Sequence, residues 1–488
     1  MNPYLVIGLI LGYFFLLIVI SWFTSRNADT QDFFTAKRKS PWLLVAFGMV
    51  GATLSGVTFI SVPGEVGNSF FSYLQFVFGN IVGYWLVAAI LLPMYYRLNL
   101  VSIYTFLEKR FGANSYKTGS FFFIISKLTG AAFRLYLVAG VLQIAIFDKF
   151  NIPFSVTVIV TIILIWIYTY RGGIKTIVWT DSLQTLFLIS AVIITIYTIS
   201  KSLGSGPGRI VDTISEHPYS QIFFWDWRTG DNFFKQFFAG MFITIVMVGM
   251  DQDMMQKTLS CKNKDEAAKN MFLFSFMFLA VVFLFLCLGV LLYVYALEAG
   301  IKIPEKTDDL YPLIALNYLG LTAGIAFLLG IIAAAYSSAD SALTALTTTF
   351  SVDFLKIDQY NENVKQKIRK RVHILFSVLL MVVILLFRVI SNESIVVAVF
   401  TVAGYTYGPI LGMFVFGMFS KRSVKDRWVP LVCIFSPLIS YMLSVNSESL
   451  FNGYEFGFEI LIVNGLFTVA GLMIISKKIK CRIVAKKC

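Results

Sequence analysis

Runs of about 20 apolar residues recur along nearly the whole of this 488-residue chain, and they limit what it can fold into. Each run is long enough to cross the ~30 Å hydrocarbon core of a bilayer as an α-helix. The chain is 58% hydrophobic and only 14% charged, with a mean hydropathy of +0.78. Soluble domains are nearer half apolar and a quarter charged. The sequence therefore predicts an all-α polytopic membrane protein.

The apolar runs predict 13 membrane-spanning helices in one membrane domain that covers residues 1–488. No A-x-A-like cleavage site follows the first run, so we expect a retained helix there rather than a signal peptide. The predicted spans lie near residues 3–24, 41–66, 72–96, 119–147, 153–170, 176–200, 233–254, 270–297, 319–350, 371–389, 394–420, 427–446 and 456–476.

The distribution of positive charge predicts how these spans are oriented. With the amino terminus outside and the carboxyl terminus in the cytoplasm, the cytoplasmic loops and tail hold 30 of the 40 Lys and Arg residues. This asymmetry follows the positive-inside rule. The net charge of +13 then reflects topology and contact with anionic lipid. A nucleic-acid partner is not expected, because the basic residues form no compact domain.

The five cysteines include no CxxC pair, so neither a disulfide framework nor a zinc site is predicted. We predict a multi-pass protein of the cell membrane, and the short tails favour a bacterial inner membrane. The expected partners are the lipid bilayer and a small-molecule substrate, and no obligate protein partner is evident.

Two of the predicted spans contain signs of a break. The second reads VGATLSGVTFISVPGEVG at 50–67, and the seventh contains Gly240 and Gly249 before MDQDMMQ. Interrupted spans at matching positions of two halves are typical of inverted-repeat transporters. The alternative is that the glycines only allow close helix packing. The offset of five spans predicts a 5+5 repeat, divided into a leading helix and loop (3–40), a first repeat (41–231), a second repeat (232–426) and two trailing helices with a basic tail (427–488).

The ninth span carries the polar sequence IIAAAYSSADS, which ends at Ser341. Polar side chains this dense are costly in hydrocarbon and occur mainly where they line an ion or substrate path. Their oxygens are ligands that small hard cations prefer. One face of this helix carries Ala334, Ser337, Ser338 and Ser341, and Asp340 flanks it.

Several long motifs give the chain a resemblance to a known family from about residue 30 to 425. These are PMYYRLNLVSIYTFLEKRFG at 93–112, GGIKTIVWTDSLQ at 172–184, DQDMMQKTLSCKN at 251–263 and AAAYSSADS at 333–341. The chain resembles the sodium:solute symporter family, which has a LeuT-like core. The resemblance implies a secondary active transporter rather than an enzyme, with sodium-coupled symport of a small organic solute by alternating access. Sodium would be co-transported and not a tightly held cofactor.

The resemblance implies a first sodium site between the broken second span and the ninth span. Its ligands would be the carbonyls of Gly51, Leu54 and Ala334 and the hydroxyls of Ser337 and Ser338. An unwound segment frees carbonyls that a cation can satisfy, which agrees with this site. The alternative is that both serines bond carbonyls one turn earlier in their own helix.

The resemblance also suggests a second ion site around Asp181, completed by Ser337, Asp340 and Ser341. A bare carboxylate within a span would be costly, so Asp181 needs a partner. The alternative is that Asp181 caps the start of the sixth span. Two carboxylates in one site also leave proton coupling open.

The substrate is expected near the midplane, against the broken helices. Thr53, Ser55 and Thr58 offer hydroxyls around the first break, which is similar to the sialic-acid branch of the family, where such hydroxyls receive the substrate carboxylate. That branch also uses an arginine in the next-but-two span. The ungapped matching position here is Gly130, and Arg134 lies about one turn away.

Further pocket candidates are Gln75, Asn80, Asp251, Gln252 and Gln256. Asp251 would either pair with Arg134 or receive a cationic or hydroxyl-rich substrate. Lys127 lies nearer the cytoplasm, and we expect its side chain to extend to the interface. The hydroxyls and Arg134 favour an organic anion, such as a carboxylated sugar or a monocarboxylate. A neutral sugar, an amino acid, a vitamin or proton coupling are the alternatives.

Two other classes of function are disfavoured. A channel would need a filter such as TVGYG, which the sequence lacks. An intramembrane enzyme is not expected, because HExxH, GxSxG and P-loop patterns are missing as well.

Overall fold

The computed structural model describes residues 3–26, 29–204, 206–390, 395–454 and 456–477. These residues are almost entirely helical, and the two short strands β1 (Ser423–Val424) and β2 (Ser476–Lys477) pair antiparallel. The long helices are α1 (Pro3–Ser25), α5 (Tyr73–Leu86) with its continuation α6 (Leu92–Leu98), α8 (Ala113–Ala145), α9 (Phe154–Gly172), α10 (Ile174–Ser202), α14 (Lys264–Glu298), α16 (Gly320–Thr349), α17 (Glu362–Ile390), α18 (Ile395–Phe419), α19 (Val429–Val445) and α21 (Ile460–Ile474).

The described residues contain nine helices that are long and apolar enough to cross a membrane, or up to eleven if each of two bent pairs is one span. The shorter apolar helices α9 and α21 lie where two further spans are predicted. The structure therefore confirms the all-α polytopic class. The count of 13 spans stays a prediction.

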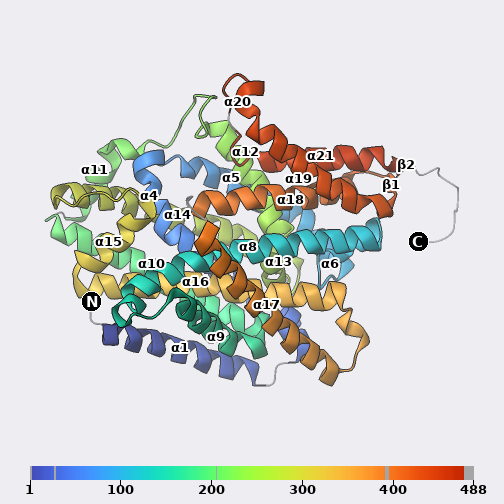
Figure 1. Ribbon diagram of the computed structural model, residues 1–488, viewed down its shortest axis with the longest axis horizontal. Helices are drawn as coiled ribbons and strands as arrows, with labels where there is room; N and C mark the ends of the chain where they lie inside the picture. Colours follow the sequence, from blue (N-terminus) through green and yellow to red (C-terminus); the bar gives the residue numbers. More distant parts are fainter. Residues whose placement is uncertain (1–2, 27–28, 205, 391–394, 455, 478–488) are drawn as a thin grey trace.

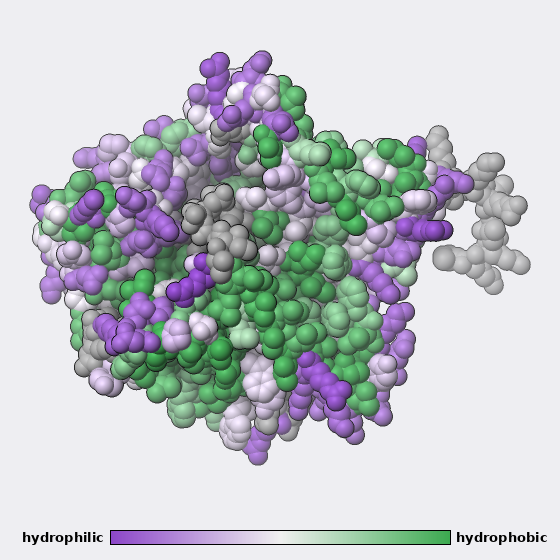
Figure 2. Space-filling view, in the orientation of Figure 1, coloured by the Kyte–Doolittle hydropathy of each residue, from purple (hydrophilic) through white to green (hydrophobic). Residues whose placement is uncertain are grey.

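Most of the long helices run in roughly the same direction, from left to right in Figure 1. Helix α1 begins at the left edge of this view, and β1 and β2 lie at the right edge. Figure 2 shows that apolar residues cover the middle of the same face, whereas hydrophilic residues gather toward its left, right and upper edges. An apolar middle between polar edges is the surface that a bilayer requires.

Both predicted breaks are present. Helix α3 (Trp42–Thr53) is bent by 61° from α4 (Gly56–Ser69). Helix α12 (Phe233–Thr244), with its continuation to Gly249, is bent by 69° from α13 (Gln252–Thr258). A helix break inside a membrane protein is stable only where other groups satisfy the freed backbone. Whether a ligand can bind at a break therefore depends on whether the protein's own groups already satisfy the freed backbone.

Tyrosine hydroxyls satisfy the second break. Tyr95 donates to the Gly249 carbonyl at 2.7 Å, and Tyr104 donates to the Met250 carbonyl at 2.9 Å. Asp251 caps α13 by accepting from the backbone N–H of Asp253 at 2.8 Å. The protein's own side chains thus complete the hydrogen bonding at this break.

Helices α5 and α12 approach each other at two glycines. A Cβ atom on Gly79 would collide with the Phe237 carbonyl, and one on Gly240 would collide with the Phe76 carbonyl. Small residues of this kind let membrane helices pack backbone to backbone. Gly240 therefore has a packing role, whereas the adjacent break is made further along, at Met250 and Asp251.

Three predicted loops contain helical structure. Helix α11 (Pro207–Glu216) lies in the loop at 201–232, with Pro207 at its first position, where the fixed φ of proline favours a helix start. Helix α15 (Leu310–Asn317) lies in the loop at 298–318. Helix α17 begins nine residues before the predicted 371, because Lys, Arg and Glu are good helix formers that a search for apolar runs does not detect.

The remaining elements are short connections between the spans. They are α2 (Thr30–Thr35), α7 (Thr105–Arg110) and α20 (Ser447–Leu450), with single turns of 3-10 helix at Ala36–Arg38, Phe147–Phe150, Pro218–Ser220, Thr307–Asp309, Ile357–Gln359 and Asp426–Trp428, and π-helical turns at Val87–Leu91, Ile245–Gly249 and Phe350–Phe354.

Candidate ion and substrate site

The break between α3 and α4 frees a backbone carbonyl in the protein interior. Leu54 (φ −79°, ψ 72°) and Ser55 (φ −64°, ψ 171°) are not helical. The Ser55 N–H donates to the Thr53 carbonyl at 3.0 Å, whereas an unbroken helix would direct it to the Gly51 carbonyl. Gly51 is buried. Its carbonyl oxygen is therefore available to a ligand other than its own helix.

Two hydroxyls of α16 lie opposite this break. Ser338 Oγ donates to the Ala52 carbonyl at 3.2 Å, and Ser337 Oγ donates to Asp181 Oδ1 at 2.7 Å. Both side chains are buried. These bonds leave α16, so the alternative in which the two serines bond carbonyls of their own helix is not what the structure shows. A hydroxyl that donates its proton keeps its lone pairs for a cation.

The five residues of the predicted first sodium site lie where α16 packs against α3 and α4. Leu54 and Ala334 are each 0% exposed, and Ala334 precedes Ser338 by one helical turn. The end of α3 that contains part of this site is held close to α10. The Gly51 N–H donates to Thr185 Oγ1 at 2.9 Å, and a Cβ on Gly51 would collide with the Thr185 side chain.

A cavity of about 450 Å³ lies against the same break. It extends from α3 and α4 to Asp231 before α12 and to the segment 457–459 before α21. A volume of this size suits a small organic molecule. The predicted substrate residues that line the cavity are Thr53, Ser55, Thr58, Arg134 and Asp251, and Asn80 lines it as well.

Arg134 and Thr53 present unused polar groups to this cavity. Among the described residues, no hydrogen bond or ion pair is made to the Arg134 guanidinium, although the side chain is half-buried in the membrane region. The Thr53 hydroxyl is buried and has no hydrogen-bond partner in the described part of the chain. Buried polar groups without partners are expensive. A ligand with acceptor oxygens would satisfy both.

An ungapped match to the sialic-acid branch places Gly130 at the position of the arginine that this branch uses. In the structure Arg134 lines the cavity, whereas Gly130 is not among its lining residues. One helical turn separates the two residues, and a change of helix start or length upstream is enough to produce this shift.

Asp231 lies at the mouth of the cavity, outside the predicted spans. Burial raises the pKa of its carboxyl above the ordinary value, and a hydrogen bond from Ser72 Oγ opposes this effect. The two oxygens are 3.5 Å apart. The mouth therefore carries a carboxyl whose charge is less favourable than that of a solvated aspartate.

Asp251 does not pair with Arg134. Its carboxylate contacts the Lys127 ammonium at 3.3 Å and accepts a hydrogen bond from Tyr407 Oη at 2.5 Å. Lys127 also contacts Asp253 Oδ2 at 2.7 Å. The expectation that Lys127 extends to the membrane interface is therefore wrong, because two buried carboxylates hold its ammonium inside. Asp251 is engaged by the protein and is not free for a cationic substrate.

Gln75 and Gln252 do not line the cavity. Gln75 Nε2 donates to the Asp231 carbonyl at 2.8 Å and holds the loop before α12. Gln252 bonds the backbone of Val101 and Ile103 in the segment before α7. Gln256 bonds the Phe34 carbonyl at 2.8 Å. These amides satisfy loop backbone groups, which sequence spacing alone cannot distinguish from a substrate contact.

The residues of the predicted second ion site also lie together. Asp181 bonds Ser337, and Asp340 Oδ2 accepts from Tyr168 Oη at 2.8 Å. Helix α10 begins at Ile174, so Asp181 is well inside the helix and does not cap it. A lysine that the sequence reasoning had not considered joins this group: Lys257 Nζ lies 2.7 Å from Asp181 Oδ2.

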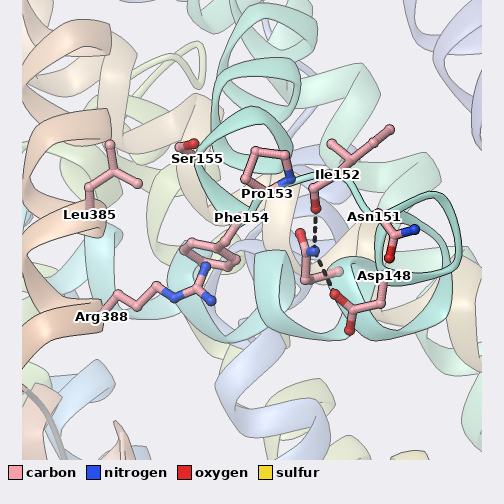
Figure 3. Close-up of a pocket in the computed structure, with 9 residues that line it drawn as sticks. Asp148, Asn151, Ile152, Pro153, Phe154, Ser155, Leu385 and Arg388 are labelled. Atoms are coloured by element: carbon pink, nitrogen blue, oxygen red, sulfur yellow. Dashed lines mark hydrogen bonds between the residues drawn. The ribbon is translucent and has the colours of Figure 1, made fainter.

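A separate cavity lies where α8, α9 and α17 come together (Figure 3). Its polar groups bond one another, since Gln143 Nε2 donates to Asp148 Oδ1 and to the Ile152 carbonyl, each at 2.7 Å. The Arg388 guanidinium lies 4.4 Å from the centre of the Phe154 ring. None of the predicted ion or substrate residues lines this cavity.

A helical membrane protein with two interrupted helices beside a buried polar cavity has the construction of a secondary transporter. The sodium:solute symporter family matches residues 33–426, so the chain belongs to this family. It is therefore a sodium-coupled symporter of a small solute, and sodium is the co-transported ion.

Two curated relatives are bacterial. The chain is 27% identical over 418 residues to the sodium/sialic acid symporter NanT of Aliivibrio fischeri, covering 82% of this chain and 80% of the relative. It is 24% identical over 434 residues to the sodium/sialic acid symporter SiaT of Proteus mirabilis, covering 85% of each. Among solved structures, a substrate-bound, outward-open Na⁺-coupled sialic acid symporter matches with a TM-score of 0.83 at 20% identity, covering 97% of this chain and 99% of that one.

Proposed function

We propose that the protein takes up an organic anion, such as a carboxylated sugar or a monocarboxylate, together with sodium. The observation that carries this proposal is the Arg134 guanidinium, which faces the cavity without a partner among the described residues. The hydroxyls of Thr53, Ser55 and Thr58 line the same cavity. A guanidinium with nearby hydroxyls is a strong receptor for a carboxylate, because charge-assisted hydrogen bonds add to Coulomb attraction.

The paired charges around the cavity support the same choice. Lys127 contacts Asp251 and Asp253, so both carboxylates already have a cation of the protein as a partner. Arg134, in contrast, has no ion-pair partner of its own among the described residues at the cavity wall. An anionic solute would supply the missing negative charge, whereas a neutral or cationic solute would leave the arginine unpaired. The sialic acid symporters among the relatives favour a carboxylated sugar, with neutral sugars, amino acids and vitamins as the alternative substrates.

Sodium would bind the carbonyls of Gly51, Leu54 and Ala334 and the hydroxyls of Ser337 and Ser338. An ion at this place would fix the end of α3, from which Thr53 and Ser55 reach the cavity. The ion would thereby stabilise the substrate-binding arrangement, which is the energetic coupling that symport requires. The repeats at 41–231 and 232–426 would move relative to each other during alternating access, in a process that includes no enzymatic step.

In the cell, we infer a multi-pass protein of a bacterial inner membrane, with the amino terminus outside and the carboxyl terminus in the cytoplasm. The positive residues of the predicted cytoplasmic loops support this orientation. The cavity would then open to the outside, since its mouth includes Asp231 from a predicted outer loop.

The test is the unfolding temperature of the detergent-purified protein in sodium chloride and in choline chloride. The added solutes are N-acetylneuraminate, its uncharged methyl ester, lactate and a neutral sugar. A ligand that binds the folded state raises this temperature. We expect a carboxylated solute to raise it only when sodium is present, and the methyl ester to have no effect.

Arg134→Gln should abolish the effect of the carboxylated solute while the effect of sodium alone persists. Arg388→Gln is the matched control, because Arg388 lies at a separate cavity and should leave both effects intact. Equal stabilisation by the acid and its ester would contradict carboxylate recognition. A protein that sodium does not stabilise at all would contradict the sodium site.

A further inference from the structure

The most heavily buried ion pair among the described residues joins α10 to α13. Lys257 Nζ lies 2.7 Å from Asp181 Oδ2, and the two side chains are 2% and 1% exposed. The other oxygen of the same carboxylate, Asp181 Oδ1, accepts a hydrogen bond from Ser337 on α16. Asp181 therefore has a cation on one side and the ion-binding helix on the other.

This ammonium contacts one member, Asp181, of the group of residues predicted to form a second ion site. Asp181, Ser337, Asp340 and Ser341 are all buried, and Asp340 lies within electrostatic range of Lys257. Lysine carries the same single positive charge as sodium and has three N–H donors. Its side chain enters from the second broken helix, whereas the predicted ligands belong to α10 and α16.

The ion pair belongs to a chain of alternating charges. Lys257 is 3.9 Å from Asp253 Oδ1, and Asp253 Oδ2 is 2.7 Å from Lys127, which also contacts Asp251. The carboxylates of Asp181, Asp251 and Asp253 thus alternate with two ammonium groups. A sodium ion added beside Asp181 would lie next to the ammonium already bound there. Repulsion between like charges is strong where water is excluded.

We propose that the Lys257 ammonium is a built-in cation that fills the second ion position, so that the protein binds and transports a single sodium ion. This inference rests on the proposed sodium site at Gly51, Leu54, Ala334, Ser337 and Ser338. Asp181 then pairs with the lysine directly. It affects the transported sodium only through the hydrogen bond that it accepts from Ser337. One sodium carried with one monoanion moves no net charge, so the membrane potential exerts little force on uptake.

The experiment measures sodium alone, without an organic solute, on the purified full-length protein. Equilibrium binding of radioactive sodium gives the number of ions per protein, and the unfolding temperature gives the steepness of the sodium dependence. We expect one ion per wild-type protein and a Hill coefficient of about one, as for a single independent site. Ser338→Ala should weaken the binding of this ion, which identifies the site that it occupies.

The Lys257→Gln variant tests directly whether the lysine ammonium takes the place of a second sodium ion. Removing the ammonium leaves Asp181 without a cation, and we expect a second sodium ion to bind, giving two per protein and a steeper sodium dependence. Lys257→Arg is the matched control: it keeps the charge and should keep one ion. If Lys257→Gln fails to fold, Asp181→Asn combined with Lys257→Gln removes both charges, and it should restore folding with one ion bound.

The outcomes separate the two proposals. A wild type that binds two sodium ions overturns the built-in cation but leaves the proposed symport in place. A wild type that binds none overturns both. A folded Lys257→Gln protein that still binds one ion also overturns the inference, as does a double variant that binds two.

Discussion

Adjacent serines on one helix have different partners, and this difference matters for the ion site. Ser338 contacts the Ala52 carbonyl at the break, whereas Ser337 contacts the Asp181 carboxylate. Ser338 therefore touches the broken end of α3, and Ser337 touches the carboxylate that pairs with Lys257. A sodium ion bound between the two would join a part of the molecule that can move to a part that is held by charge.

Ser338→Ala should weaken sodium binding. The variant removes one of five proposed ligands, and we expect the half-saturating sodium concentration to rise about tenfold, which corresponds to ~1.4 kcal/mol. The measurement is the sodium dependence of the unfolding temperature. Ser440→Ala is the control, since this buried hydroxyl bonds only the Ser436 carbonyl in its own helix. An unchanged sodium dependence in Ser338→Ala would remove Ser338 from the site.

Lys127→Met should strongly destabilise the protein. The lysine contacts Asp251 and Asp253, and its loss leaves the buried Asp251 carboxylate without a counter-charge, at a cost of about 3–5 kcal/mol. Thermal unfolding in detergent measures the loss. The exposed Lys117 lies on the same helix α8, so Lys117→Met should change the unfolding temperature little. Equal stability of the two variants would show that the charge network contributes little.

At the scale of helices, close packing and the break occur at different residues in the second broken helix. Gly79 and Gly240 bring α5 and α12 into backbone contact, while the bend of the second broken helix occurs at Met250 and Asp251. The first break combines both functions over a short stretch, because Gly51 packs on Thr185 and lies a few residues before Ser55. Glycine content alone therefore does not locate a break.

Gly240→Ala should lower stability by about 1–3 kcal/mol, since the added methyl group has no space against the Phe76 carbonyl. Gly12→Ala provides the comparison: it lies within α1, and nothing is within 4 Å of an added Cβ. Alanine there should be neutral or slightly stabilising. Unfolding temperatures of the two variants measure the difference, and similar values would contradict the packing role of Gly240.

The sequence predicts the helices and both breaks because these depend on local patterns of apolar residues and glycine. It also identifies Ser337, Ser338 and Asp181 as unusual, since polar groups in an apolar run are visible without a structure. It does not predict the partner of Asp181. Lys257 lies just past a break, where a spacing rule for one helix no longer applies, and its position depends on how α13 packs against α10.

At the scale of the whole molecule, the cavity lies toward the side that we predict to face the outside of the cell. Its lining reaches the outer end of α4 at Ser69 and the loop residue Asp231. On the opposite side, Asp353 accepts hydrogen bonds from Ser102, Tyr116 and Ser120 and ties α16 to α8 and to the segment before α7. With the proposed orientation, this arrangement would be that of an outward-facing transporter.

Ser69→Cys should react with a membrane-impermeant thiol reagent in intact cells, because Ser69 lines the outer part of the cavity. Sodium and the substrate together should slow the reaction. Lys264→Cys, at an exposed position that we predict to be cytoplasmic, should react only after the membrane is permeabilised. The reverse pattern would invert the predicted orientation of the whole protein.

The hydroxyls of Tyr95 and Tyr104 at the second break have a mechanical consequence. They satisfy the Gly249 and Met250 carbonyls without a bound ion, so we expect the bend between α12 and α13 to be insensitive to sodium. The Gly51 carbonyl at the first break has no such side chain among the described residues. If sodium binds at the Gly51 carbonyl as proposed, it would stiffen the first break and leave the second unchanged. Backbone amide exchange should then depend on sodium at the first break alone.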